Sequence, residues 1–127
     1  MIVEFNVPIR VESVNRTRNR HWAVRYKERN MQREAINACW LTQVRPHQRL
    51  AIKRAASNGL NVRFTRIGPG KLDPDNIVAA MKAATDCMAD ILHVDDADPR
   101  VIYQYESKRG KRGEYWLIVR VATRHVA

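Results

Sequence analysis

The chain has 127 residues, of which 45% are apolar and 28% charged, the balance of one folded domain and not of a disordered segment. No run approaches the roughly 20 apolar residues of a membrane-spanning helix. The N-terminus carries Glu4 where a secretory signal would be basic, so we expect a cytoplasmic protein without membrane contact. Two isolated cysteines, Cys39 and Cys87, predict buried free thiols and no zinc or redox site.

The first half of the chain predicts a strand, a long loop and two helices. Residues 2–9 alternate between apolar and polar side chains, which is typical of a strand with one buried face. Residues 10–26 are basic and aperiodic, which predicts a loop. Residues 27–44 have a helical apolar spacing that Pro46 ends, and residues 47–57 predict a second, shorter helix. The apolar stripe of the first helix is expected to consist of Met31, Ala35, Ala38 and Leu41.

The next two elements are a strand and a well-marked helix. Residues 60–65 again alternate, which predicts a strand. Asp73 is a favourable N-cap and Pro74 a favourable first helical residue, so a helix is expected from there to Leu92. Its apolar stripe consists of Ile77, Met81, Ala84, Met88, Ile91 and Leu92.

The C-terminal part predicts two strands. Residues 101–105 and 115–121 have strand patterns, and the glycine-containing basic segment between them predicts a hairpin. The order β-α-β-α-β-β indicates the α/β (α+β) class. We expect a single domain over residues 1–127, with a single-layer mixed sheet of about four strands packed by two or three helices.

Charge is distributed unevenly along the chain. The net charge is +10, which favours nucleic acid as a partner. All seven aspartates lie between Asp73 and Asp98, where Lys82 is the one basic residue, so this window carries −6 and the rest of the chain +16. Such a division suits metal-dependent chemistry on phosphodiesters. Helix caps and a solvated helix face that fall together by chance would produce the same division.

Two acidic motifs remain as candidates for metal binding. Asp73 and Asp75 stand one residue apart at the start of a helix, where two carboxylates can reach one cation, and Asp96 follows the end of that helix. Taken singly, the first two are explained by capping and the helix dipole, and the last by a turn. Asp86 and Asp90 are expected on the solvent side of the helix, with Lys82 and Asp86 forming an i,i+4 pair.

The combination LDPDN, an alanine-rich helix, VDD, a strand and a basic hairpin resembles the RusA family of Holliday junction resolvases. The resemblance is firm over residues 72–96 and extends loosely over most of the chain. It implies that Asp73, Asp75 and Asp96 are the catalytic, metal-binding carboxylates, with Asp95 as a helper. The sequence departs from the family pattern at Ala79, where members often carry lysine, and its spacing between the two motifs is about two residues longer.

The resemblance implies a dimeric, Mg²⁺-dependent endonuclease that nicks four-way DNA junctions symmetrically, with Mn²⁺ able to replace Mg²⁺ and with no organic cofactor. Two rivals stay open: a basic nucleic-acid-binding protein without catalysis, and a nuclease acting on other branched DNA or on RNA. The candidate DNA-binding residues are the basic residues Arg16, Arg18, Arg20, Arg25, Lys71, Lys108, Arg109, Lys111 and Arg112.

Helix length bears on how the carboxylates meet. A helix from Asp75 to Leu92 is about 25 Å long, so Asp96 cannot share a cation with Asp75 of the same chain unless the helix is broken or the chain doubles back. Contribution of Asp95 and Asp96 by the partner subunit of a homodimer would resolve this. A two-fold dimer also matches the two-fold axis of a four-way junction.

Overall fold

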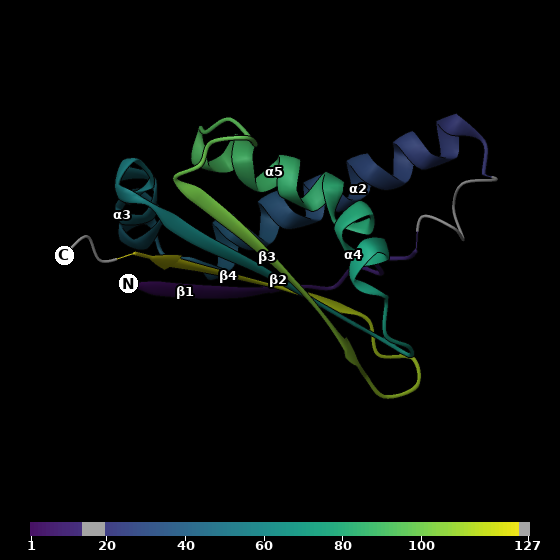
Figure 1. The fold of residues 1–127 in the computed structure, drawn as a ribbon. Helices are drawn as coiled ribbons and strands as arrows, with labels where there is room; N and C mark the ends of the chain where they lie inside the picture. Colours follow the sequence, from purple (N-terminus) through teal and green to yellow (C-terminus); the bar gives the residue numbers. More distant parts are fainter. Residues whose placement is uncertain (14–19, 125–127) are drawn as a thin grey trace.

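The computed structural model describes residues 1–13 and 20–124 (Figure 1). Within these residues the chain forms four strands, four α-helices and one 3₁₀ helix. In chain order they are β1 (Ile2–Val7), α2 (Trp22–Gln43), α3 (Pro46–Ala55), η1 (Ala56–Asn58), β2 (Leu60–Gly68), α4 (Pro74–Ala80), α5 (Lys82–Leu92), β3 (Val101–Arg109) and β4 (Trp116–Thr123).

The strands form one mixed sheet in the order β1-β4-β2-β3. β2 runs parallel to β3 and antiparallel to β4, and β4 is antiparallel to β1. The predicted α+β class and four-stranded mixed sheet are therefore confirmed. The predicted hairpin between the last two strands is wrong, because β2 lies between them. Residues 110–115 cross the end of β2 instead, where the Gly110 amide donates to the Gly68 carbonyl (2.7 Å).

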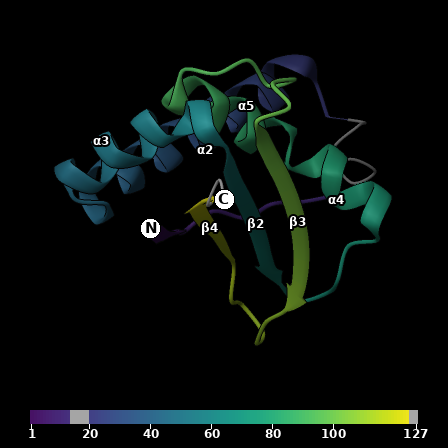
Figure 2. The same cartoon turned by 60° about the vertical axis from the view of Figure 1, so that its left-hand side comes forward.

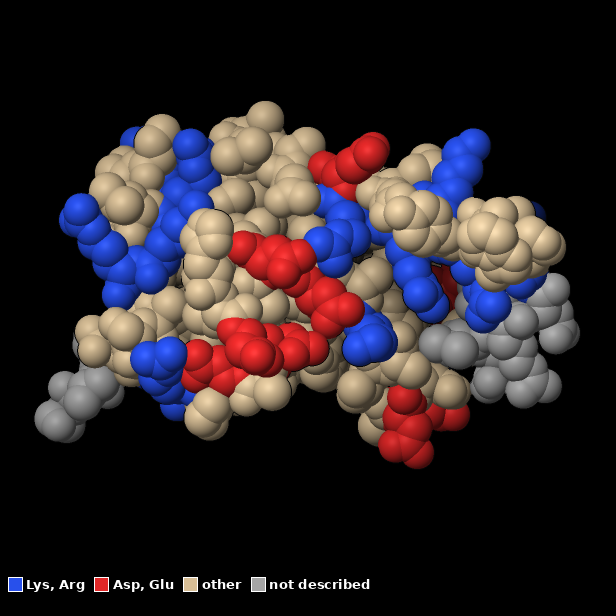
Figure 3. Space-filling model, turned by 90° about the horizontal axis from the view of Figure 1, so that it is seen from above, with Lys and Arg blue, Asp and Glu red and all other residues tan. Residues whose placement is uncertain are grey.

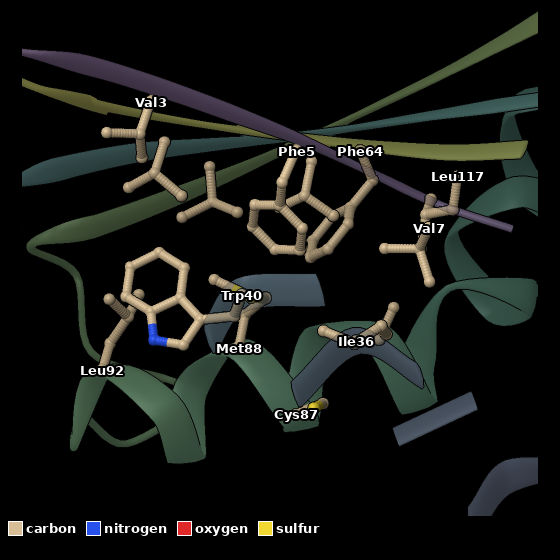
Figure 4. Packing of buried hydrophobic residues seen from close by; sticks show 14 of the residues in the cluster. Val3, Phe5, Val7, Ile36, Trp40, Phe64, Cys87, Met88, Leu92 and Leu117 are labelled. Atoms are coloured by element: carbon tan, nitrogen blue, oxygen red, sulfur yellow. The ribbon is translucent and has the colours of Figure 1, made fainter. Parts of the chain in front are cut away.

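Among the described residues, the helices all lie on one face of the sheet and none lies on the other (Figures 1 and 2). Strand alternation follows from this two-layer arrangement, as each strand of the sheet turns every second side chain toward the helices. The pattern predicted for β1 is confirmed: Val3, Phe5 and Val7 are buried while the residues between them are exposed. Figure 4 shows these side chains meeting those of the helices in one apolar core.

The buried face of α2 differs from the predicted one. Met31 and Leu41, expected in the apolar stripe, are 59% and 60% exposed. Ile36, Trp40 and Val44, spaced by four, are buried instead, and the Trp40 ring meets the edge of Phe5 at 5.8 Å between centroids. Apolar residues lie on both faces of this helix, and the core takes the face with the larger side chains because burial of more apolar surface is more favourable.

The start of α2 also corrects a prediction. The helix begins at Trp22, inside the segment that the sequence predicted to be a loop up to Tyr26. His21 serves as its N-cap, and its Nδ1 accepts a hydrogen bond from the Ala23 amide (3.2 Å). The first turns carry exposed large residues such as Trp22 and Tyr26, so they lack the apolar periodicity that reveals a packed helix.

The helix predicted to run unbroken to Leu92 is divided at Met81. This residue has φ −93° and ψ 5°, which ends α4 and begins α5. The Thr85 hydroxyl donates to the Met81 carbonyl (2.9 Å), a contact known to bend helices. The predicted apolar stripe is confirmed across the break, because Ile77, Met81 and Met88 are all buried.

The two edge strands of the sheet, β1 and β3, have different neighbours. At the β1 edge the Gln43 side chain takes the place of a neighbouring strand: its Oε1 accepts from the Asn6 amide (2.9 Å) and its Nε2 donates to the Asn6 carbonyl (2.7 Å). The nine-residue strand β3 forms the opposite edge and has β2 on one side only among the described residues. β3 therefore has no neighbouring strand on its other side among these residues, and Leu72 and α4 lie beside it from Tyr103 to Ser107.

Both cysteines are free thiols, as predicted. Cys87 of α5 is buried, and burial raises the pKa of its thiol to about 11, whereas Cys39 of α2 is half-buried. Among the described residues, no helix combines the length and the apolar character needed to cross a lipid bilayer.

Candidate metal and nucleic-acid site

Asp73 and Asp75 lie where the chain leaves β2 and enters α4. The Leu72 amide donates to Ser107 Oγ of β3 (3.0 Å), and the Asp73 carbonyl accepts from the Ile77 amide (2.9 Å). Asp73 occupies the predicted N-cap position, but its carboxylate makes no capping bond. Both carboxylates are exposed and, within residues 1–13 and 20–124, neither has a hydrogen-bond or ion-pair partner.

A buried arginine holds the turn that presents these carboxylates. Arg66 of β2 is 7% exposed, although the strand pattern gave no sign of a buried charge at this position. Its Nε donates to the Val11 carbonyl (3.1 Å), and its Nη1 donates to the Gly70 carbonyl. A Cβ at Gly68 would come within 2.7 Å of the Arg66 guanidinium, so glycine leaves the space that the arginine fills. The N-terminal segment and the turn before Asp73 are thereby fixed to β2.

A groove of about 420 Å³ lies between α4 and the edge strand β3. Leu72 and Pro74, the neighbours of Asp73 in the chain, are among its lining residues. Tyr103 and Tyr105 of β3 form its aromatic wall. Burial, and next the neighbouring Tyr105, raise the pKa of Tyr103 to about 12, so this tyrosine stays neutral. The groove is therefore apolar beside an exposed pair of carboxylates.

The second acidic motif follows α5 and is engaged in its own turn. Asp95 Oδ1 accepts from the Ala97 amide (2.9 Å). Asp98 accepts from the Arg100 amide (2.9 Å) and forms an ion pair with the Arg100 guanidinium (2.7 Å). The hydrogen bond from the Arg100 side chain, followed by the bond from its backbone amide, lowers the pKa of Asp98 to about 2. Asp96 is exposed and has no hydrogen-bond or ion-pair partner in the described part of the chain.

The two motifs lie at opposite ends of β3. Leu72 is bonded to Ser107 near the end of this strand, whereas the Arg100 carbonyl, just before its start, accepts from the Leu60 amide. Seven strand rises separate Arg100 from Ser107, about 23 Å. Within the described residues, no three His, Cys, Asp or Glu side chains are grouped so that they could hold a metal ion. One chain therefore does not bring Asp73, Asp75 and Asp96 together, even though the helix between them is broken.

Asp73 and Asp75 provide two of the three carboxylates expected for a Mg²⁺ site. Mg²⁺ is commonly bound by one or two carboxylates while water and substrate phosphate fill its other positions. The two exposed carboxylates without partners provide this minimum. They do not provide the third carboxylate that the family resemblance implies, and Asp96 of the same chain is at the wrong end of β3.

Five of the predicted DNA-binding residues lie at the same end of the sheet as Asp73. Lys71 belongs to the turn before α4, and the other four end β3 or follow it, where Gly110 is bonded to Gly68. The Lys108 ammonium also pairs with Glu106 (3.7 Å). These five residues, which we call the basic tip, are Lys71, Lys108, Arg109, Lys111 and Arg112.

The predicted DNA-binding residues near the N-terminus have mixed positions. Arg16 and Arg18 lie outside the described residues. Arg20 forms ion pairs with Glu12 (2.9 Å) and Glu28 (2.6 Å), so its charge is largely balanced within the chain. Arg25 lies on α2 and is half-buried, not in a loop as predicted.

The acids expected to face solvent have structural partners. Lys82 and Asp86 form the predicted i,i+4 pair (3.9 Å). Asp90 is exposed and pairs with Arg33 of α2, which joins α2 to α5. Figure 3 shows the acidic side chains of this face lying between basic side chains at both ends of the molecule.

Comparison with protein-family models found no match for the chain, and a search of curated proteins found none either.

Proposed function

We propose that the chain is a metal-dependent endonuclease that nicks branched DNA, as its resemblance to the RusA family implies. The observation that carries this proposal is the pair Asp73 and Asp75, two exposed carboxylates without a partner among the described residues, beside the basic tip. Mg²⁺ is commonly bound in proteins by one or two carboxylates, with water and substrate phosphate completing its shell.

The residues of the site divide into two roles. The basic tip binds phosphates on either side of the scissile bond and positions the DNA without reading its bases. Asp73 and Asp75 hold Mg²⁺, which when bound supplies charge neutralisation at the phosphate and lowers the pKa of an attacking water. The groove between α4 and β3 is lined by the neighbours of Asp73 in the chain, so it lies next to the carboxylates along the chain.

A homodimer supplies the missing carboxylate. Paired antiparallel with its counterpart, the edge strand β3 would place the start of one strand beside the end of the other. Asp96 lies in the turn before the start of β3, and the end of β3 is bonded to Leu72, the residue before Asp73. Each of the two sites would then combine Asp73 and Asp75 of one subunit with Asp96 of the other, as the distance within one chain requires.

Charge supports this pairing. The segment that precedes β3 contains three aspartates. The end of β3 and the turn after it contain four lysine or arginine residues of the basic tip. Antiparallel pairing sets the acidic start of one strand against the basic end of the other, whereas parallel pairing would set like charges together. On the other edge of the sheet, Gln43 occupies the backbone amide and carbonyl of Asn6, which hinders pairing at that position.

The first experiment compares cleavage by two variants. A labelled four-way junction is incubated with Mg²⁺ and wild type, Asp75→Asn or Asp86→Asn protein. We expect Asp75→Asn to lose cleavage by at least about 100-fold, because a direct metal ligand matters at least as much as its supporting groups. Asp86→Asn is the matched control and should cut like wild type, since Asp86 pairs with Lys82.

The outcome also separates the rivals. Intact junction with wild type, with binding that survives EDTA, would overturn the nuclease proposal in favour of a binding protein. Cleavage of a single-stranded flap or of RNA at a higher rate than the junction would change the substrate class. Equal loss of activity in both variants would show that Asp75 is not a special position.

A mixing experiment tests the shared site. Asp75→Asn and Asp96→Asn proteins are each expected to be inactive, but a mixed dimer contains one site with both substitutions and one intact site. We therefore expect the mixture, after subunit exchange, to regain nicking of one strand of the junction. Continued inactivity of a mixture in which exchange is verified with tagged subunits would place each complete site within one chain.

A further inference from the structure

The exposed face of α3 carries basic residues that the proposed active site does not use. Residues 35–72 contain no acid and seven lysines or arginines. Two of these seven basic residues have structural roles. Arg66 is buried, and the guanidinium of Arg49 donates to the Leu41 and Val44 carbonyls at the end of α2 (3.0 and 2.5 Å). What remains on and beside α3 is an exposed group that we call the α3 patch, made of Arg45, Lys53 and Arg54.

The α3 patch is electrostatically uncompensated. No ion pair joins its residues to an acid in the described part of the chain. Arg45, Arg49 and Lys53 follow one another at intervals of four, and like charges at this spacing destabilise a helix by a few tenths of a kcal/mol per pair. The helix dipole favours Lys53 and Arg54 in the last turn but opposes Arg45 at the first. Dipole stabilisation therefore does not account for the whole group.

The patch is far from the basic tip. α3 ends just before β2 begins at Leu60, and the basic tip lies beside Gly68, where β2 ends. Eight strand rises, about 26 Å, separate these two ends of β2. Figure 1 shows α3 and the turn after β3 at opposite ends of the sheet, and Figure 3 shows basic side chains gathered at the α3 end.

We infer that the α3 patch is a second phosphate-binding surface, which holds a duplex segment separate from the one at the basic tip. This inference rests on the proposed function only in taking DNA as the polyanion. The spacing exceeds the width of one double helix, so the two surfaces can contact two arms of branched DNA at once. An anionic membrane is a poorer fit, because α3 buries its apolar residue Ile52 against the core and exposes only Leu50 to insert.

The test measures binding in EDTA, so that it does not depend on cleavage. Affinity for a labelled four-way junction is measured against salt concentration for wild type, Lys53→Gln/Arg54→Gln and the matched control Lys82→Gln/Arg33→Gln. Both double variants remove two positive charges, but the control residues are paired with Asp86 and Asp90. Glutamine retains good helix propensity, and circular dichroism verifies the fold of each variant.

We expect the α3 variant to lower the slope of log K against log salt by about 0.9 for each phosphate that it no longer neutralises, which weakens affinity about eightfold per phosphate at 0.1 M salt. The control should keep the wild-type slope. Arg45→Gln, at the other end of α3, should lower the slope independently. Replacement of Lys108, Arg109, Lys111 and Arg112 by alanine should add to the α3 effect, since the two surfaces are too distant to couple.

Wild-type slopes in both α3 variants, or equal changes in variant and control, would overturn the inference. So would loss of binding to phosphatidylserine vesicles by the α3 variants with DNA binding unchanged, because the patch would then serve a membrane. A protein that shows the expected slopes but never cuts a junction contradicts the endonuclease proposal alone. A protein that cuts, with unchanged slopes, contradicts the α3 inference alone.

Discussion

Two acidic segments lie at opposite ends of β3, and they use their carboxylates differently. Asp95 and Asp98 accept hydrogen bonds from their own turn, and Asp98 has Arg100 as a counter-charge. Asp73 and Asp75 have no such partners among the described residues, and the N-cap bond that Asp73 is placed to make is absent. The first arrangement stabilises a turn. The second leaves oxygen ligands available to something outside the chain.

The arginine beside each acidic segment also differs between the two. Arg100 is exposed and bonded to one aspartate, so it acts locally. Arg66 is buried and donates to the carbonyls of Val11, far away in the chain, and of Gly70, in the turn before Asp73, so it joins these two segments through their backbone. A rigid turn with available carboxylates is what a binding site needs, because the coordinating groups are positioned before the ion arrives. The difference between the two segments can be tested by substitutions in each.

The largest effect on folding is expected for Arg66→Ala. Loss of the buried guanidinium leaves the Val11 and Gly70 carbonyls without their donor and opens a cavity beside Gly68, which should cost about 2–4 kcal/mol of unfolding free energy. Urea denaturation measures this loss. Arg100→Ala is the control and should cost much less, since its ion pair is exposed. Equal losses of unfolding free energy in the two variants would mean that Arg66 does not hold the turn before Asp73.

A smaller, pH-dependent effect is expected for Asp98→Asn. The folded-state pKa of Asp98 is about 2, below its ordinary value of 3.8, so the carboxylate stabilises the fold fully above pH 4 and this stabilisation is lost as the pH falls toward 2. Wild type should therefore be more stable than Asp98→Asn at pH 6, and this difference should be much smaller at pH 2, where the Asp98 carboxylate is half protonated in the folded state. Thermal unfolding across this range measures the difference. A difference that persists unchanged at pH 2 would contradict the role of the ion pair.

The smallest effect on folding is expected for Asp75→Asn, the variant expected to lose cleavage. Because the carboxylate has no partner in the described part of the chain, its removal should change the unfolding free energy by no more than about 0.5 kcal/mol. Urea denaturation of the same preparation used for cleavage provides the measurement. A large destabilisation would show that Asp75 stabilises the fold. Loss of cleavage by Asp75→Asn would then be explained by unfolding and not by loss of a metal ligand.

Local patterns in the sequence were sufficient for individual elements. The alternation of Leu60, Val62 and Phe64 and the apolar stripe that includes Ile77 and Met88 both predicted the buried side chains, because periodicity follows directly from strand and helix geometry. The position of Asp73 at the start of a helix was predicted for the same reason. Each of these inferences needs only residues close in the chain.

Features that depend on distant parts of the chain were not predictable in this way. The sequence of β3 and β4 does not reveal that β2 lies between them, since strand order is decided by packing of the whole sheet. The burial of Arg66 depends on the carbonyl of Val11, 55 residues away in the chain, which no local pattern identifies. The helix break at Met81 had one local signal, Thr85, whose hydroxyl bonds back to it.

The clamp of Gln43 on Asn6 sets a limit on the size of any assembly formed through the sheet. A sheet with one open edge can join one other copy, and the pair then has no further edge to offer. Replacing Gln43 with alanine would uncover the second edge while leaving the first intact. Each copy could then join two neighbours, and a closed pair would give way to an open-ended fibre. The side chain of Gln43 thereby protects the edge strand at Asn6 from pairing with another copy.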